Sequence, residues 1–139
     1  MTPNGNGAPG QQLLHQELTG LILKGFFQAH YELGFGFSER THLNAMEIVL
    51  LDLGLKVERR VPIDVRFRGR AIGRFKADLI VESTVMLELK AMRRPHPAFE
   101  AQLLNYLRAT QIEAGLLLFF NPKPVKKRLI FTNDRKLVR

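Results

Sequence analysis

Apolar residues in the first quarter of the chain recur every three or four positions, which is the period of an α-helix. The residues on this face are Leu14, Leu18, Leu21, Ile22, Gly25 and Ala29. They predict a helix over about residues 13–31, and the glycine-containing segment 33–36 interrupts the pattern. The glycine-, proline- and asparagine-rich residues 1–11 carry no charge and no period, so a flexible tail is expected there.

A second helix is predicted from Ser38, a good N-cap residue, to about Asp52, with Gly54 ending it. Its expected buried stripe consists of Leu43, Met46, Ile48, Val49, Leu50 and Leu53. The chain then changes to a period of two, because the odd positions from Val57 to Phe67 are mostly apolar and the even ones mostly charged. This alternation predicts a strand with one buried face.

The rest of the chain predicts more strands and one more helix. The expected elements are strands at about 72–81, 84–92, 115–120 and 127–132, and a helix at about 98–111. A tight turn at residues 82–83 would make the first three strands an antiparallel meander, and Pro95 and Pro97 mark the entry to the helix. The strand at 115–120 is apolar throughout after its glycine, which is typical of a strand buried on both faces.

Length and composition are those of one ordinary globular domain. The chain has 139 residues, 45% of them hydrophobic and 24% charged, so a single domain over residues 12–139 is expected. Without cysteine the protein has no disulfides, thiolate zinc site or cysteine nucleophile, and any metal must bind oxygen or imidazole. The sequence shows neither a signal peptide nor a membrane-spanning stretch, so we expect a soluble, cytoplasmic protein without a membrane partner.

Positive charge is concentrated in two segments. Residues 56–76 hold eight basic and two acidic side chains, and residues 123–139 hold seven basic and one acidic, within a net charge of +8. The candidate nucleic-acid contacts are Arg66, Arg68, Arg70, Arg74, Lys76, Lys126, Lys127 and Arg128. Such clusters favour binding to a phosphate backbone. The alternative is that these charges only solvate the exposed faces of strands.

Two acids and one lysine are the strongest candidates for chemistry. Glu88 and Lys90 are two residues apart on one predicted strand, so they project from the same face, while Leu87 and Leu89 turn to the other. Asp78, near the end of the preceding strand, is expected to lie close to Glu88. Paired carboxylates of this kind can bind Mg²⁺, and the lysine can act on a phosphate nearby. A structural salt bridge from Glu88 to Lys90 or Lys76 is an equally good interpretation from the spacing alone.

Gln102 and Tyr106 are four residues apart and therefore share one face of the predicted third helix. An amide and a phenol at this spacing can contact a phosphate, a bound water or a base. The plainer interpretation is an amphipathic helix whose tyrosine belongs to the core. The four histidines show no zinc-binding spacing and are expected at the surface or as helix caps.

Asp78, the ELK run at 88–90 and the QxxxY pattern of Gln102 and Tyr106 together resemble the PD-(D/E)XK nuclease superfamily, in particular its exonuclease-like branch. Further blocks are similar to the small bacterial GxxExxY proteins over about residues 17–131. These blocks are ELGFGFSE at 32–39, VERRVPI at 57–63, GRFKADLIV at 73–81, ELKA at 88–91, AQLLNYL at 101–107 and GLLL at 115–118.

The resemblance implies an α/β fold with a restriction-endonuclease-like core, a central mixed sheet flanked by helices. It implies that Asp78, Glu88 and Glu39 bind Mg²⁺ or Mn²⁺ and that Lys90 is the catalytic lysine. Gln102 and Tyr106 would face the substrate. The chain departs from the family pattern at His42, where the family name has tyrosine, and at Phe99, where histidine is expected.

Three functions remain open at this stage. The first is a metal-dependent nuclease that hydrolyses phosphodiester bonds of DNA or RNA. The second is a nucleic-acid-binding or accessory subunit with the same fold and no turnover. The third is an interaction protein, for example a homodimer, in which Asp78, Glu88 and Lys90 form an inert ion cluster.

Overall fold

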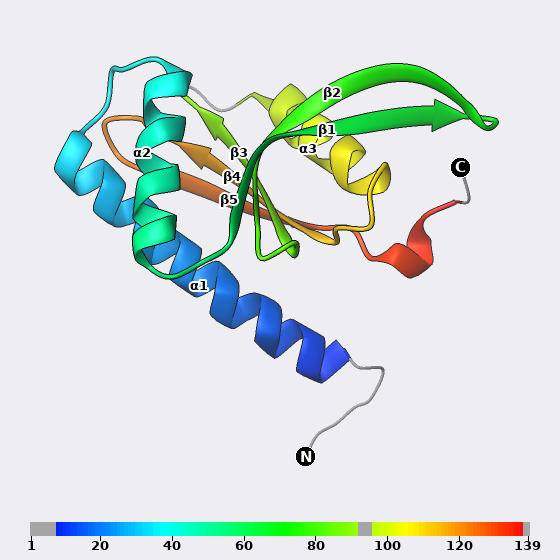
Figure 1. Ribbon diagram of the computed structural model, residues 1–139, viewed down its shortest axis with the longest axis horizontal. Helices are drawn as coiled ribbons and strands as arrows, with labels where there is room; N and C mark the ends of the chain where they lie inside the picture. The colour runs from blue at the N-terminus through cyan, green and yellow to red at the C-terminus, as the bar shows by residue number, and fades with distance from the viewer. Residues whose placement is uncertain (1–7, 92–95, 138–139) are drawn as a thin grey trace.

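The computed structural model describes residues 8–91 and 96–137, with side chains from residue 15 onward. The α-helices lie around one sheet (Figure 1). The elements in chain order are α1 (Ala8–Leu33), α2 (Glu39–Asp52), β1 (Val57–Phe67), β2 (Arg70–Val81), β3 (Val85–Lys90), α3 (Pro97–Arg108), β4 (Ala114–Phe119), β5 (Val125–Ile130) and a 3₁₀ turn, η1 (Asn133–Arg135).

The five strands form one mixed sheet in the order β1-β2-β3-β4-β5. The pairs β1–β2, β2–β3 and β4–β5 are antiparallel, whereas β3 and β4 are parallel and are connected through α3. A helix is the usual connection between parallel neighbours because the chain must cross the sheet to return in the same direction. This arrangement confirms the predicted α/β class with a central mixed sheet flanked by helices.

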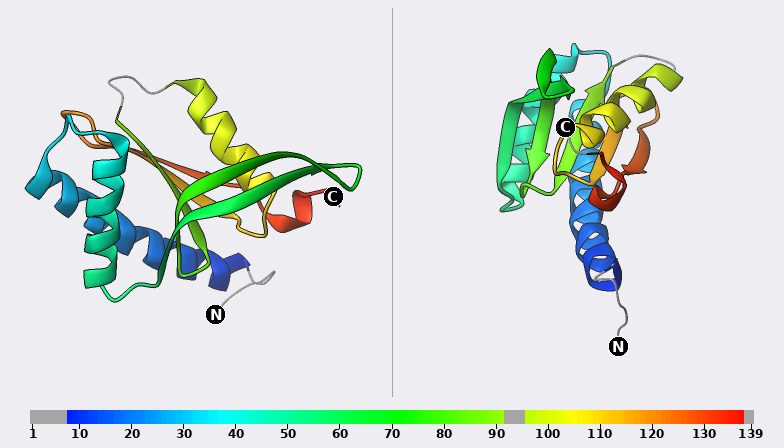
Figure 2. Two further views of the ribbon diagram at one scale, coloured as in Figure 1. Left: turned by 45° about the horizontal axis from the view of Figure 1, so that its top comes forward. Right: turned by 90° about the vertical axis from the view of Figure 1, so that its right-hand side faces the viewer.

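Helices cover both faces of the sheet (Figure 2). Residues of α1 and α2, including Phe26 and Met46, form one buried cluster with Leu87 and Leu116 of the sheet. Residues of α3 form the other cluster, on the opposite face, with Met86 among the strand residues. α3 approaches the sheet closely at Gly115, where an added Cβ would lie only 3.0 Å from a Leu103 methyl group. The two cores leave β3 and β4 buried on both faces, as predicted for β4.

Local sequence signals explain where several elements begin and turn. The Ser38 hydroxyl accepts a hydrogen bond from the Thr41 N–H at 3.2 Å and caps α2 as predicted. His96 caps α3 through Nδ1, and Pro97 occupies the first helical turn. The β1–β2 hairpin turns at Arg68 and Gly69, whose φ values of 51° and 77° suit a two-residue turn between twisted strands.

Element ends differ from the predictions by a few residues. α1 begins at Ala8, so residues 8–11 of the predicted tail are helical, and residues 1–7 of that tail lie outside the described residues. β3 ends at Lys90 and α3 at Arg108, earlier than predicted, and β5 runs two residues ahead of its predicted position. Ile48, expected to be buried, is 59% exposed because α2 turns the face that carries Met46 and Leu50 toward the core.

The β1–β2 hairpin extends beyond the rest of the sheet, on the side where α3 lies (Figure 1). Its outer half is mostly exposed, in contrast to β3 and β4. Among residues 8–91 and 96–137, none of the helices combines the length and the hydropathy that a bilayer span would require.

Candidate functional site at the fork between β2 and β3

The candidate site lies where β2 and β3 separate. Residues 79–81 of β2 pair with residues 85–87 of β3. The part of β2 that precedes Leu79 pairs with β1 alone. Asp78 and Glu88 are the first residues beyond this pairing, one on each strand. The sequence prediction that these two acids are neighbours is consistent with this placement.

Each carboxylate binds a backbone N–H group of the opposite strand. The Asp78 N–H donates to Glu88 Oε2 at 2.9 Å, and the Leu89 N–H donates to Asp78 Oδ2 at 2.8 Å. The side chains thus replace the ladder hydrogen bonds that end at the fork. Buried N–H groups need such partners, so this exchange fixes both carboxylates in place.

β1 is distorted directly opposite this point. Arg60 has a φ of 53° and is passed over in the β1–β2 register, together with Asp78. A non-glycine residue in this left-handed region is uncommon and costs energy. The Arg60 guanidinium lies 3.9 Å from Asp78 Oδ1, so the distortion accompanies a cation beside the carboxylate pair. Sequence reasoning did not identify Arg60, because nothing in the sequence distinguishes it from any other arginine on an exposed strand.

Lys90 lies on the α3 side of the sheet, as its alternation with Leu87 and Leu89 predicts. Its Nζ atom is 3.5 Å from Gln102 Oε1 and 4.6 Å from the centroid of the Phe99 ring. Among the described residues, no ion pair joins Glu88 to Lys90 or Lys76. The geometry therefore gives no support to the salt-bridge interpretation of this lysine.

The remaining predicted site residues surround the fork at different depths. Gln102 is half-buried beside Lys90, and Tyr106, only 6% exposed, belongs to the core cluster below α3. The core interpretation of Tyr106 thus holds for its ring. Glu39, exposed at the start of α2, accepts a hydrogen bond from the Ala91 N–H at 3.4 Å, just beyond the end of β3.

Burial raises the pKa of both carboxyl groups at the fork. Burial first, and then the charge of Asp78, raises the pKa of Glu88 to about 8, against the opposing effect of the hydrogen bond from the Asp78 N–H. Burial likewise raises the pKa of Asp78, while the Leu89 hydrogen bond and the charges of Lys90 and Arg60 oppose the rise. Burial also raises the pKa of Tyr106, to which the negative charges of Glu88 and Asp78 contribute. Two acids that repel each other in a dry setting are a favourable place for a cation.

The donor set at the fork fits a hard divalent cation. Asp78 and Glu88 offer oxygen ligands only, and Mg²⁺ is commonly held by one or two carboxylates, with water and substrate phosphate completing its shell. No group of three histidine, aspartate or glutamate side chains suited to an ion occurs within residues 8–91 and 96–137. Glu39 acts on both carboxylates through its charge, and its part in the metal set stays a prediction.

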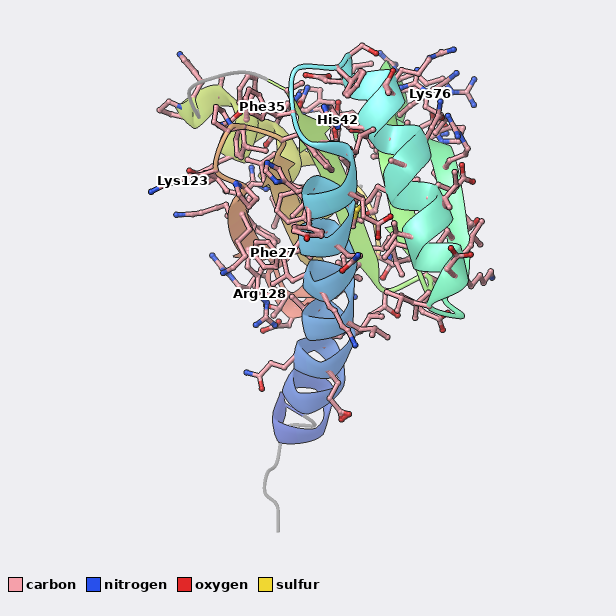
Figure 3. The ribbon with its side chains drawn as sticks, turned by 90° about the vertical axis from the view of Figure 1, so that its left-hand side faces the viewer. Phe27, Phe35, His42, Lys76, Lys123 and Arg128 are labelled. Atoms are coloured by element: carbon pink, nitrogen blue, oxygen red, sulfur yellow. The ribbon has the colours of Figure 1, made fainter. Side chains whose placement is uncertain are left out.

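The predicted basic contacts fall into two groups at opposite edges of the sheet. Arg66, Arg68, Arg70, Arg74 and Lys76 are exposed on the β1–β2 hairpin, and Lys126, Lys127 and Arg128 are exposed on β5. Figure 3 shows Lys76 and Arg128 on opposite sides of the molecule. Arg74 pairs with Asp64 at 3.2 Å, and Lys127 lies 3.9 Å from Glu100. One short stretch of nucleic-acid backbone cannot contact all eight residues at once.

His42, expected at the surface or at a helix cap, is instead fully buried. Its ring stacks on Phe120 with centroids 4.2 Å apart, and neither ring nitrogen has a hydrogen-bond partner. Burial lowers the pKa of His42, with a smaller contribution from His30. His42 is therefore part of the core.

Comparisons with known proteins show the family and the fold of the chain. The sequence profile of the PD-(D/E)XK nuclease superfamily matches residues 16–130. A solved structure titled "Crystal structure of SSO0001" has a similar fold, with a TM-score of 0.52 and 18% sequence identity over 90% of this chain. The match covers 63% of that longer chain, less than two thirds of its length. No curated protein matches the chain. With its profile match over most of the sequence, the chain belongs to the PD-(D/E)XK nuclease superfamily.

Proposed function

We propose that this protein is a divalent-metal-dependent nuclease that hydrolyses phosphodiester bonds of DNA or RNA. The observation that carries the proposal is the fork, where the Glu88 carboxylate accepts from the Asp78 N–H and the Asp78 carboxylate accepts from the Leu89 N–H. Lys90 lies on the Glu88 side of the sheet, with its Nζ atom 3.5 Å from Gln102 Oε1. Membership in a nuclease superfamily supports the same chemistry. The finer resemblance to the GxxExxY proteins is part of this proposal.

Asp78 and Glu88 are the residues that would hold Mg²⁺ or Mn²⁺, with Glu39 near enough to act through its charge on both. When bound, such an ion activates water and offsets negative charge on the phosphate. The ion also competes with protons, so Glu88 would ionise on binding despite its raised pKa.

The side chains of Lys90, Gln102 and the hairpin arginines would act on the substrate. Lys90 places an ammonium group beside the acids, where it stabilises charge that develops on a phosphate oxygen. Gln102, within 3.5 Å of Lys90 Nζ, orients that ammonium group. The exposed arginines of the β1–β2 hairpin are close to the fork in the chain and would hold the nucleic-acid backbone.

The test is cleavage of labelled single- and double-stranded DNA and RNA in Mn²⁺ by the wild type and by Asp78→Asn, Glu88→Gln and Lys90→Met. We expect each substitution to lower cleavage by roughly 100- to 1,000-fold, the usual effect of removing one electrostatic group from an active site. Glu47→Gln is the matched control, because Glu47 pairs with Arg59 outside the fork. Equal cleavage by the wild type and the fork variants would show that the observed cleavage does not come from the fork.

A binding protein without turnover is the second candidate. It is favoured by the distance of the β5 cations from the fork and by the absence of a three-acid group within the described ranges. Salt-dependent binding of nucleic acid, with no cleavage in Mg²⁺ or Mn²⁺ by any variant, would select it over the nuclease.

A further inference from the structure

A groove of about 560 Å³ runs between α3 and the outer half of the β1–β2 hairpin. Its lining includes Val65 and Phe75 from the hairpin and Ala101, Gln102, Asn105 and Tyr106 from α3. Pockets for small ligands commonly measure ~300–1,000 Å³ and combine apolar walls with a few polar groups. This groove has both the size and the composition of such a pocket.

The groove opens next to the fork. Gln102 lines it and also lies 3.5 Å from Lys90 Nζ, which in turn is on the Glu88 side of β3. A ligand in the groove would therefore lie beside the group that the proposed function places on the phosphate. The position suits the part of a nucleotide next to the reacting phosphate.

The walls suit a flat aromatic ligand. The Phe75 ring is 44% exposed, although its centroid lies only 5.6 Å from that of Tyr106. Exposed aromatic rings beside a charged track are the usual platforms on which unpaired bases stack. The amides of Gln102 and Asn105 each offer both a donor and an acceptor, which is what a base edge requires.

The far end of the groove becomes polar and basic. There it adjoins a second pocket of about 500 Å³, and Arg108 and Ala109 line both. Arg66 and Lys136 also line this second pocket, with Asp64 as an opposing charge. An apolar, ring-lined part followed by a basic part matches a base followed by a phosphate along a nucleic-acid strand.

We propose that the groove binds the base of an unpaired nucleotide, so that the substrate class is single-stranded DNA or RNA; this rests on the proposed function. In a duplex both faces of each base are already stacked, and a base must be unpaired and flipped out before it can enter a pocket. The groove therefore selects strands whose bases are unpaired.

Intrinsic fluorescence gives a direct test. The sequence contains two tyrosines and no tryptophan, so Tyr31→Phe leaves Tyr106 as the only fluorophore of its kind. Tyr31 is 85% exposed on α1, away from the groove. This full-length variant is titrated, in Ca²⁺ buffer, with four probes of equal length: single-stranded DNA, single-stranded RNA, a blunt DNA duplex and an abasic phosphodiester strand. Gels run after each titration verify that the probes are intact.

We expect unpaired DNA or RNA, or both, to quench Tyr106 emission, whereas the duplex and the abasic strand leave it unchanged. The arms with DNA and RNA show which strand is preferred. Phe75→Ala should weaken binding of the unpaired strand about tenfold, within the range known for loss of one stacking ring. Phe75→Tyr should keep the affinity, since it keeps the ring. Phe67→Ala is the control, because Phe67 is exposed on the same hairpin and does not line the groove.

The inference is overturned if the duplex or the abasic strand quenches as strongly as the unpaired strands. It is also overturned if Phe75→Ala leaves the affinity unchanged in a variant with normal thermal stability. The latter would be expected if another protein, rather than a base, occupies the groove. Cleavage that depends on Asp78 and Glu88 without any quenching would reject the base site alone. Quenching without metal-dependent cleavage would reject the proposed nuclease and leave the base site standing.

Discussion

The centre of the sheet and its β1–β2 hairpin are parts of one structure with opposite surroundings. All residues of β4 and the first five of β3 are buried, whereas most of the outer hairpin is exposed, and it carries several basic side chains. The carboxylates Asp78 and Glu88 lie at the boundary, where β2 leaves β3 and continues in the hairpin. The centre provides a dry, rigid setting that raises carboxylate pKa values, and the hairpin provides charge and an exposed ring for a ligand. A site at the fork draws on both.

The largest expected effect concerns stability in the buried centre. Leu87→Ala removes a side chain with no exposed surface and should lower the free energy of unfolding by about 2–5 kcal/mol, because it leaves a cavity. Ile72→Ala, at a position 66% exposed on the hairpin, should change it by less than about 0.5 kcal/mol. Urea denaturation of both variants measures the difference. Equal losses would show that the hairpin is as tightly packed as the centre.

The next effect concerns pH. The pKa of Glu88 is raised to about 8 in the folded protein, from an ordinary value of 4.5, so the folded state holds a proton that the unfolded state has lost. Stability of the metal-free protein should therefore fall as pH rises, by on the order of 3 kcal/mol between about pH 5 and about pH 8. Burial of Asp78 acts in the same direction.

Denaturation curves across this pH range check the slope. Glu88→Gln should flatten it and leave a more stable protein at the alkaline end, while Glu58→Gln, at an exposed position of β1, should leave the slope as in the wild type. A wild-type stability that rises with pH over this range would contradict the buried, repelling pair.

The smallest effect concerns the hairpin charges. Arg66→Ala combined with Arg70→Ala should make the salt dependence of single-strand binding less steep, by about 1.4 in the slope of log K against log salt. Lys126→Ala combined with Arg128→Ala removes the same charge from β5, at the far edge of the sheet, and should leave the slope nearly unchanged. Filter binding at several salt concentrations distinguishes the pairs. If the β5 pair of substitutions changed the salt dependence more than the hairpin pair, the nucleic acid would bind at the β5 edge of the sheet.

Most elements were predictable because their periods are unambiguous. The even and odd residues of β3 divide between the two cores as alternation requires, which places Glu88 and Lys90 on one side. The closeness of Asp78 and Glu88 followed from a short turn between two strands. These are local consequences of strand geometry, so one sequence was enough.

Features that depend on distant packing were not predictable. The left-handed conformation of Arg60 occurs where the β1–β2 register skips a pair, and the buried ring of His42 stacks on Phe120, which is far away in the sequence. The groove at Phe75 exists only because the hairpin lies beside α3. Glu39 was assigned to a metal by resemblance alone, and its spacing gave no sign of the hydrogen bond that it accepts from the Ala91 N–H beyond β3.

Binding of Mn²⁺ measured by calorimetry on the full chain is the most direct test of the fork as a metal-dependent site. We expect the wild type to bind Mn²⁺ with release of protons, since Glu88 must ionise, and Asp78→Asn or Glu88→Gln to abolish binding. Glu47→Gln should bind as the wild type does. Binding of Mn²⁺ that is unchanged in both fork variants would contradict the assignment of the metal to these two carboxylates.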